Sequence, residues 1–142
     1  MRELRLTQHV VDEIITHARA DVPNECCGIL GGKQAVVTSA FRVRNTARSP
    51  VKYLMDQQDQ AKIMYKIDTS GDEIVAFYHS HTKSEAYPSI TDINQARLSG
   101  WVDQAYLIIS LKEPENPVIR AFYMQPEGSP DDVEEAQLHF GG

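Results

Sequence analysis

The sequence predicts an α/β domain built around a mixed sheet, because segments with helix and strand patterns alternate along the chain. Two apolar runs, residues 74–78 and 105–111, have the continuous hydrophobicity of strands that are buried on both faces. Other segments show apolar residues at helical spacing behind residues that favour a helix N-terminus. The length of 142 residues suits one domain, so we expect all these elements to share one fold.

The N-terminal part predicts a helix followed by a β-hairpin. Thr7 is suited to cap the helix, and Pro23 is suited to end it. The buried face of this helix is predicted from apolar residues at helical spacing, namely Val10, Val11, Ile14, Ile15 and Ala18. Residues 27–30 and 36–43 are predicted to be paired strands, with the glycine-rich residues 31–33 as the turn between them.

The second part of the chain continues the alternation. Asp56 can cap a second helix that runs to about residue 67, and residues 70–72 form a turn into the strand that begins at residue 74. The other predicted elements are a short strand at 51–55, a helix from Ser89 to about Leu98 that Gly100 stops, and strands at 105–111 and 118–124. Residues 131–140 are acidic and have few apolar positions, so their pattern is ambiguous.

The net charge, the hydrophobic pattern and the cysteine positions limit the partners and the cellular location that we expect. A net charge of −6 argues against nucleic acid as the natural partner. No apolar run is long enough to cross a bilayer, and residues 1–5 lack the apolar core of a signal peptide, so we expect no membrane contact and a cytoplasmic location. Cys26 and Cys27 are neighbours, which disfavours a disulfide between them and predicts buried free thiols. The oligomeric state is left open, a homodimer included.

The candidate metal-binding residues begin at the end of the strand at 74–78. His79 and His81 are two residues apart, so on a strand they point the same way and form half of a tetrahedral zinc site, while Ser80 points to the opposite face. Ser89 can cap the next helix, which places Asp92 in its first turn as a third, anionic ligand. Three protein ligands leave a fourth position for water, as in catalytic zinc sites. The alternative is structural: residues 89–92 also form a capping box, and a histidine at a strand end is often solvated.

The spacing His79-x-His81, seven residues, Ser89-x-x-Asp92, with Glu25 upstream, resembles the signature of the JAMM (MPN+) zinc metallopeptidases. Three segments, residues 18–30, 45–50 and 78–92, are similar to the bacterial Mec-type branch of that family. Enzymes of this branch trim the C-terminus of a small ubiquitin-like sulfur-carrier protein, for example by releasing a cysteine built on the carrier. The resemblance extends from the first helix to about Met124.

This resemblance implies a single MPN domain over residues 1–142, with deaminase-like α-β-α layers around the mixed sheet. Its core would be residues 1–125, and the C-terminal segment 126–142 is the part that the resemblance supports least. It also implies zinc as the cofactor, one ion per chain, held by His79, His81 and Asp92. Glu25 would then be the general base, and Ser89 would stabilise the oxyanion.

The implied partner is a ubiquitin-like sulfur carrier, and three alternative functions compete with this one. One is a JAMM deubiquitinase-like isopeptidase of other conjugates, and another is a non-catalytic MPN scaffold that only binds a partner. A zinc nucleoside deaminase is excluded because the chain lacks His-x-Glu and Pro-Cys-x-x-Cys. The loop at residues 82–88 is expected to form a wall of the substrate groove. Arg42, Arg44 and Arg48 are either a solvated face or contacts for a substrate carboxylate.

Overall fold

The computed structural model describes residues 2–125 and 132–141. In these ranges the helices are α1 (Gln8–Asp21), α2 (Gln57–Thr69) and α3 (Ile90–Ser99). The strands are β1 (Glu3–Leu6), β2 (Cys27–Lys33), β3 (Val36–Val43), β4 (Glu73–His81), β5 (Ala105–Ser110), β6 (Val118–Met124) and β7 (Val133–Phe140). None of the helices in the described ranges is both long and apolar enough to cross a membrane.

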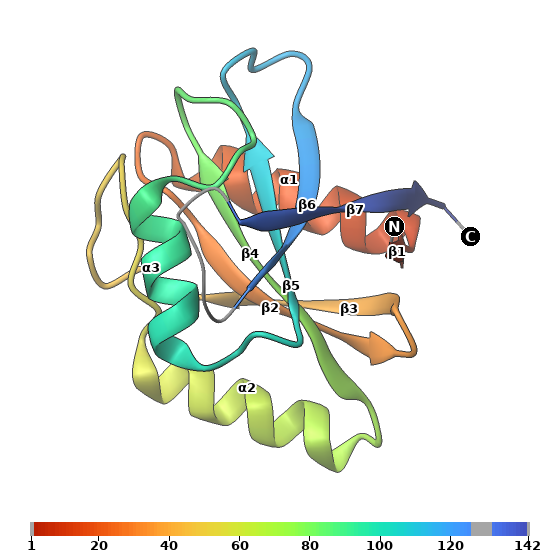
Figure 1. The fold of residues 1–142 in the computed structure, drawn as a ribbon. Coiled ribbons are helices and arrows are strands. Elements are labelled where there is room, and N and C mark those ends of the chain that lie inside the picture. Colours follow the sequence, from red (N-terminus) through yellow and green to blue (C-terminus); the bar gives the residue numbers. More distant parts are fainter. Residues whose placement is uncertain (1, 126–131, 142) are drawn as a thin grey trace.

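The strands form one mixed sheet that closes into a barrel in the order β1-β3-β2-β4-β5-β6-β7. The central strand β4 pairs antiparallel with β2 and parallel with β5. The parallel pairing of β1 with β7 closes the ring. Helix α1 lies on one side of this sheet, whereas α2 and α3 lie on the other (Figure 1). The predicted α/β class and its layers around a mixed sheet are confirmed.

Two apolar cores separate on the two faces of β4. Ala76 and Tyr78 face the core that includes Ile14 and Ala18 of α1. Phe77, between them in sequence, faces the core that contains Ile67 of α2 and Ile93 and Ala96 of α3. Because consecutive side chains of a strand point to opposite faces, a strand that is covered on both sides must be apolar throughout. The prediction that β4 is buried from both sides is therefore confirmed.

The hairpin turn lies later than the sequence predicts. Strand β2 continues through Lys33, and the turn is formed by Gln34 and Ala35, whose φ angles are 50° and 66°. The prediction placed the turn at residues 31–33, because Gly31 and Gly32 are typical turn residues. Their actual role is steric, since the pairing shifts between them and a Cβ on Gly32 would overlap the carbonyl of Val36.

The chain ends contribute two strands that the sequence did not define. β1 was not predicted, although Leu4 and Leu6 alternate with exposed residues and are buried. β7 falls within the ambiguous segment 131–140, of which residue 131 lies outside the described residues. The predicted strand at 51–55 is wrong, because only an isolated bridge between Asn45 and Met55 forms there. β1 and β7 are stabilised by pairing with strands that are distant in sequence, and local sequence patterns do not reveal such pairing.

The predicted helix ends agree with the structure. Thr7 accepts a hydrogen bond from the Val10 N–H, and Asp56 accepts one from the Asp59 N–H. Helix α3 begins at a capping box and ends at Gly100, which adopts a φ of 78° that glycine favours. These caps fix where α2 and α3 start relative to the sheet, and the start of α3 is part of the candidate site.

Candidate metal centre

The C-terminal end of β4 brings two histidines together. His79 and His81 point to the same face of the strand, and the Nε2 atoms of the two buried rings lie 3.2 Å apart. Hydrogen-bonded pairing with β2 and β5 on either side holds this backbone in place. The structure thus joins the two imidazoles that the sequence spacing singled out.

Asp92 reaches the histidines from the first turn of α3. Its Oδ2 atom lies 3.1 Å from His79 Nε2 and 3.0 Å from His81 Nε2. The same oxygen accepts a hydrogen bond from the Ser89 N–H, while Ser89 Oγ accepts one from the Asp92 N–H. The structural interpretation of this motif is confirmed, and it is compatible with the metal-ligand interpretation, because the capping box also directs the carboxylate to the histidines.

The three ligand atoms have the geometry that a small cation needs. In a tetrahedral site with bonds of about 2.0 Å, two ligand atoms lie about 3.3 Å apart, close to the spacing observed here. His81 Nδ1 donates to the Glu85 carbonyl at 2.7 Å, which leaves the Nε2 lone pair directed at the centre. Within residues 2–125 and 132–141, this is the only convergent group of three or more metal-ligating side chains. The donor set fits a bound metal ion.

The electrostatics of the group favour a positive charge at its centre. Burial lowers the pKa of His79, so this ring is neutral and can act as a ligand. Burial also raises the pKa of Asp92, but the charges and hydrogen bonds of His79 and His81 outweigh it and hold the pKa well below its usual range. Burial opposes a proton on His81, yet hydrogen bonds with Asp92 and Glu85 raise its pKa. A cation would take the place of that proton.

Glu25 lies beside the centre, although it is far from His79 in sequence. Cys27 pairs with His79, and continuing that antiparallel register places Glu25 opposite His81. The side chain is 4% exposed, and its Oε1 atom has no hydrogen-bond partner among the described residues. Burial raises its pKa to about 8. A buried carboxylate without a partner costs stability, which favours a role in function.

The loop at residues 45–55 borders the same centre through Tyr53, a residue to which the sequence analysis gave no role. The buried Tyr53 ring stacks on the His79 ring, with the ring centres 4.4 Å apart. Thr82 donates a hydrogen bond to the Pro50 carbonyl, which joins this loop to the one that follows His81. Tyr53 carries no recognisable sequence signal, because its place depends on how the loop folds over β4.

The buried polar residues next to the histidines have structural roles. Ser80 points away from the candidate ligands, and its Oγ atom accepts a hydrogen bond from the Cys26 N–H at 2.8 Å, as expected. Cys26 and Cys27 are free and fully buried. Burial raises the pKa of Cys26 to about 12 and also raises that of Cys27. Neither thiol is therefore ionised at neutral pH, which argues against a nucleophilic role.

The three arginines of the 42–48 segment are not equivalent. Arg42 pairs with Glu13 at 2.8 Å, and Arg44 lies 3.4 Å from Asp56 and 3.3 Å from Asp59. These partners within the chain favour a structural role for Arg42 and Arg44 over the predicted contact with a substrate. Arg48 is exposed at a loop position with a φ of 46°.

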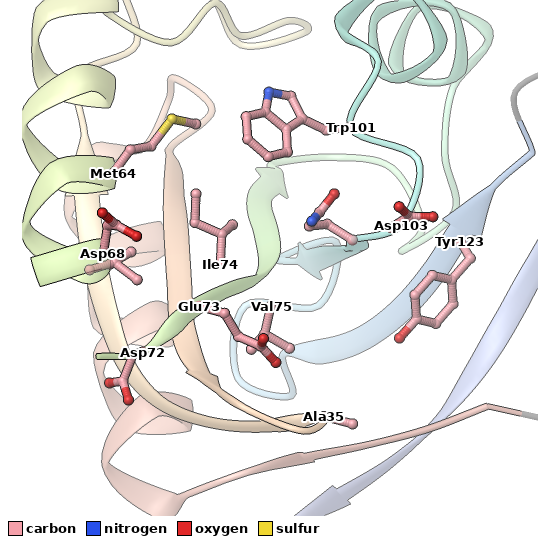
Figure 2. A pocket seen from close by; sticks show the side chains of 12 residues that line it. Ala35, Met64, Asp68, Asp72, Glu73, Ile74, Val75, Trp101, Asp103 and Tyr123 are labelled. Atoms are coloured by element: carbon pink, nitrogen blue, oxygen red, sulfur yellow. The ribbon is translucent and has the colours of Figure 1, made fainter. Parts of the chain in front are cut away.

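Two hollows differ in their relation to the centre. A pocket of about 470 Å³ opens at the other end of β4, where Asp68, Asp72, Glu73 and Asp103 line it with Trp101. Figure 2 shows these carboxylates at separate places around the pocket, so they do not converge as metal ligands do. A second groove of about 360 Å³ includes Tyr53 in its lining together with residues of α2 and α3. Neither lining includes His79, His81 or Asp92, and Tyr53, which stacks on His79, is what connects the second groove to the candidate centre.

The family follows from comparison of the whole chain. A family model described as prokaryotic homologs of the JAB domain matches residues 7–125. This chain belongs to that family. The match includes Glu25, both histidines, Ser89 and Asp92, and it confirms the resemblance to JAMM (MPN+) proteins that the motif indicated.

Several relatives of this JAB-family chain carry names that describe peptidases. The desampylase of Haloferax volcanii is 40% identical over 114 residues, which cover 75% of this chain and 80% of the relative. The CysO-cysteine peptidase of Mycobacterium tuberculosis is 33% identical over 115 residues, with coverage of 80% and 77%. The probable TtuB-protein conjugate cleaving protease of Thermus thermophilus is 30% identical over 95 residues, with coverage of 66% and 64%.

Solved structures of two other proteins share the fold. A solution structure of a Desulfitobacterium hafniense protein matches with a TM-score of 0.83 and 31% identity, covering 96% of this chain and 92% of the other. A JAB1/MPN domain protein from Archaeoglobus fulgidus matches with a TM-score of 0.62 and 15% identity, covering 98% and 100%. At 15% identity the second comparison supports the fold alone.

Proposed function

We propose that this chain is a zinc metallopeptidase that hydrolyses a peptide or isopeptide bond at the C-terminus of a small ubiquitin-like sulfur-carrier protein. The observation that carries the proposal is the buried triangle of His79, His81 and Asp92 beside the unpartnered Glu25 carboxylate. Two imidazoles and one carboxylate form a set of three ligands that suits zinc and leaves room for a reacting group. Zinc, when bound, would act as a Lewis acid on the scissile carbonyl and on the attacking water.

The roles of the protein residues follow from their hydrogen bonds and charges. Glu25 takes the proton of the attacking water and returns it to the leaving amine, and a pKa raised by burial to about 8 suits a proton carrier near neutral pH. Ser89 Oγ already accepts the Asp92 N–H, so its own O–H is available to donate to the oxyanion. Removing such a donor typically costs about 3 kcal/mol of transition-state stabilisation.

The substrate proposal rests on the named relatives and on the burial of the centre. One relative is named as a peptidase of CysO-cysteine and another as a probable protease that cleaves TtuB-protein conjugates, and we infer a carrier-type substrate for this chain as well. The candidate ligands are buried, so a scissile bond must arrive on a thin, extended tail, which a Gly-Gly sequence without side chains provides. A non-catalytic scaffold is disfavoured, because Glu25 and Ser89 are retained beside the complete ligand triangle.

The test is mass spectrometry of carrier proteins incubated with the purified chain. Ubiquitin-like carriers encoded near its gene, each bearing a C-terminal extension after Gly-Gly, should lose one residue or a short peptide. Replacing the penultimate glycine of the carrier by a bulky residue should lower turnover far more than it weakens carrier binding, because remote contacts remain. Equal cleavage of both tails, or rapid cleavage of unrelated unfolded proteins, would instead indicate a broader peptidase.

A further inference from the structure

Asn45 is the hydrogen-bonding hub of the loop at residues 45–55. Its Oδ1 atom accepts the N–H groups of Ala47 at 3.0 Å and Leu54 at 2.9 Å. Its Nδ2 atom donates to the Lys52 carbonyl at 3.1 Å. The second N–H of the same amide donates to the Glu25 carbonyl, outside the loop, at 3.0 Å. One side chain therefore joins both arms of the loop to the backbone of the candidate base.

The loop holds Glu25 by both of its backbone polar groups. The Glu25 N–H donates to the Ser49 carbonyl at 2.8 Å, and the Glu25 carbonyl accepts from Asn45. The Glu25 side chain has no such support, since Oε1 lacks a partner among the described residues. The position of the carboxylate therefore depends on its backbone, and the backbone depends on this loop.

We propose that Asn45 is a positioning residue that acts through Glu25, holding the base at the distance from the ligand triangle that proton transfer requires. This inference rests on the proposed peptidase function for its kinetic consequence. The same loop places Tyr53 against His79 and joins Pro50 to Thr82, so it contacts both the base and the ligand-bearing strand end. Because of these contacts, a shift of the loop also shifts the Glu25 backbone and with it the candidate base.

Asn45→Asp isolates this role, because it retains the acceptor for Ala47 and Leu54 but replaces the donor with an oxygen that repels the Glu25 carbonyl. Asn45→Ala removes all four hydrogen bonds of the side chain. Thr46→Val is the matched control, since it removes a side-chain hydrogen bond from Thr46 to Leu54 in the same loop and leaves Glu25 untouched.

The first readout is hydrogen exchange at the Glu25 amide, measured by NMR in the purified full-length chain. The Glu25 N–H donates to the Ser49 carbonyl of the loop that Asn45 orders, so Asn45→Asp should loosen that hydrogen bond and speed the exchange by about tenfold, while the β4 amides keep their protection. Thr46→Val should leave the Glu25 amide unchanged. This readout needs no substrate, so it decides whether Asn45 holds Glu25 even if the chain hydrolyses no carrier.

The second readout is kinetic and uses the zinc-loaded enzyme. Asn45→Asp should lower kcat by about tenfold or more, with KM within about twofold and zinc content unchanged, since a misplaced base affects the transition state alone. In a Glu25→Gln background the same substitution should cost almost nothing further, because its effect passes through Glu25. Unchanged exchange at Glu25 in both Asn45 variants, or a full additional loss in the Glu25→Gln background, would overturn the proposal.

Discussion

His17 of α1 and His79 of β4 are buried on opposite sides of β4, and the two rings are held in opposite ways. On the α1 face, His17 uses both ring nitrogens: Nδ1 lies 2.7 Å from the Tyr78 hydroxyl and Nε2 lies 3.3 Å from an Asp21 carboxylate oxygen. On the other face, His79 Nδ1 is buried without a hydrogen-bond partner among the described residues, and Nε2 faces another imidazole and Asp92.

The difference separates a buried histidine with a structural role from one that we propose to be a metal ligand. A buried polar group that has all its partners stabilises a unique packing, as His17 does between α1 and β4. A group of buried ligands that converge on one point, beside a carboxylate with no partner, is stable only if something else completes it. Burial alone does not distinguish the two, because His17 and His79 are both almost inaccessible.

The largest expected effect concerns metal content. His79→Ala or His81→Ala should abolish zinc binding, Asp92→Asn should weaken it at least about 100-fold, and the wild type should carry about one zinc per chain. His17→Gln is the matched control, since it changes a histidine of equal burial on the other face and should retain zinc. Elemental analysis of the purified variants measures this. Full zinc in all three ligand variants would show that the centre is misplaced.

The next effect separates chemistry from binding. Glu25→Gln should retain zinc and fold but lose hydrolysis by about 10²–10⁴-fold, the usual contribution of a general base. Carrier cleavage under single-turnover conditions is the measurement, and Glu13→Gln, a change of a glutamate on the α1 side, is the control. Activity that persists in Glu25→Gln would remove this residue from the mechanism.

A third prediction uses the pH dependence of stability in the metal-free protein. The pKa of Glu25 is raised by burial to about 8, so between pH 4.5 and 8 the unfolded chain releases a proton that the folded chain keeps. Stability therefore falls as pH rises through this window. Glu25→Gln should remove that slope and be more stable than the wild type at pH 8 by about 1–3 kcal/mol. Urea unfolding at pH 5 and pH 8 tests this, and parallel slopes for both proteins would contradict it.

The smallest effect belongs to the structural face. Tyr78→Phe removes the hydroxyl that satisfies His17 Nδ1 and should destabilise the fold by about 1–3 kcal/mol without changing zinc content. Tyr65→Phe is the control, since Tyr65 is 72% exposed and should not change stability. Chemical denaturation with parallel metal analysis measures both quantities. Loss of zinc in Tyr78→Phe would show that the two faces are not independent.

The three candidate ligands could be predicted from the sequence, because local geometry determines where their side chains point. The two-residue repeat of a strand directs His79 and His81 to one face, and helix capping fixes Asp92 in a first turn. Glu25 entered only through the family resemblance, because its distance from His81 is set by the register between β2 and β4. Asn45 and Tyr53 gave no local signal, since their contacts depend on the path of a loop.

The fold shows the same difference between elements that local patterns define and elements that depend on distant pairing. Among the long elements with a clear pattern, α1 was predicted with nearly the observed bounds, and the predicted strand at 74–78 lies inside β4, which runs on to His81. β1 and β7 are paired with each other from opposite ends of the chain, so neither has a local pattern that defines it. Gly31 and Gly32 predicted a turn because glycine is typical of turns, whereas here it permits the close approach of two strands.

Closure of the barrel has a consequence for how extended peptides are handled. Open sheet edges attract foreign strands and promote aggregation, and a closed ring of strands removes such edges. In the described residues the ring is complete from β1 to β7. At the seam of the ring, β1 covers β3 only at Val36 and Val37, so the rest of β3 is the one stretch of edge in the described residues that lies open beside that seam. An extended tail therefore finds little free edge on this sheet, and discrimination among tails falls mainly to the loops beside the candidate centre.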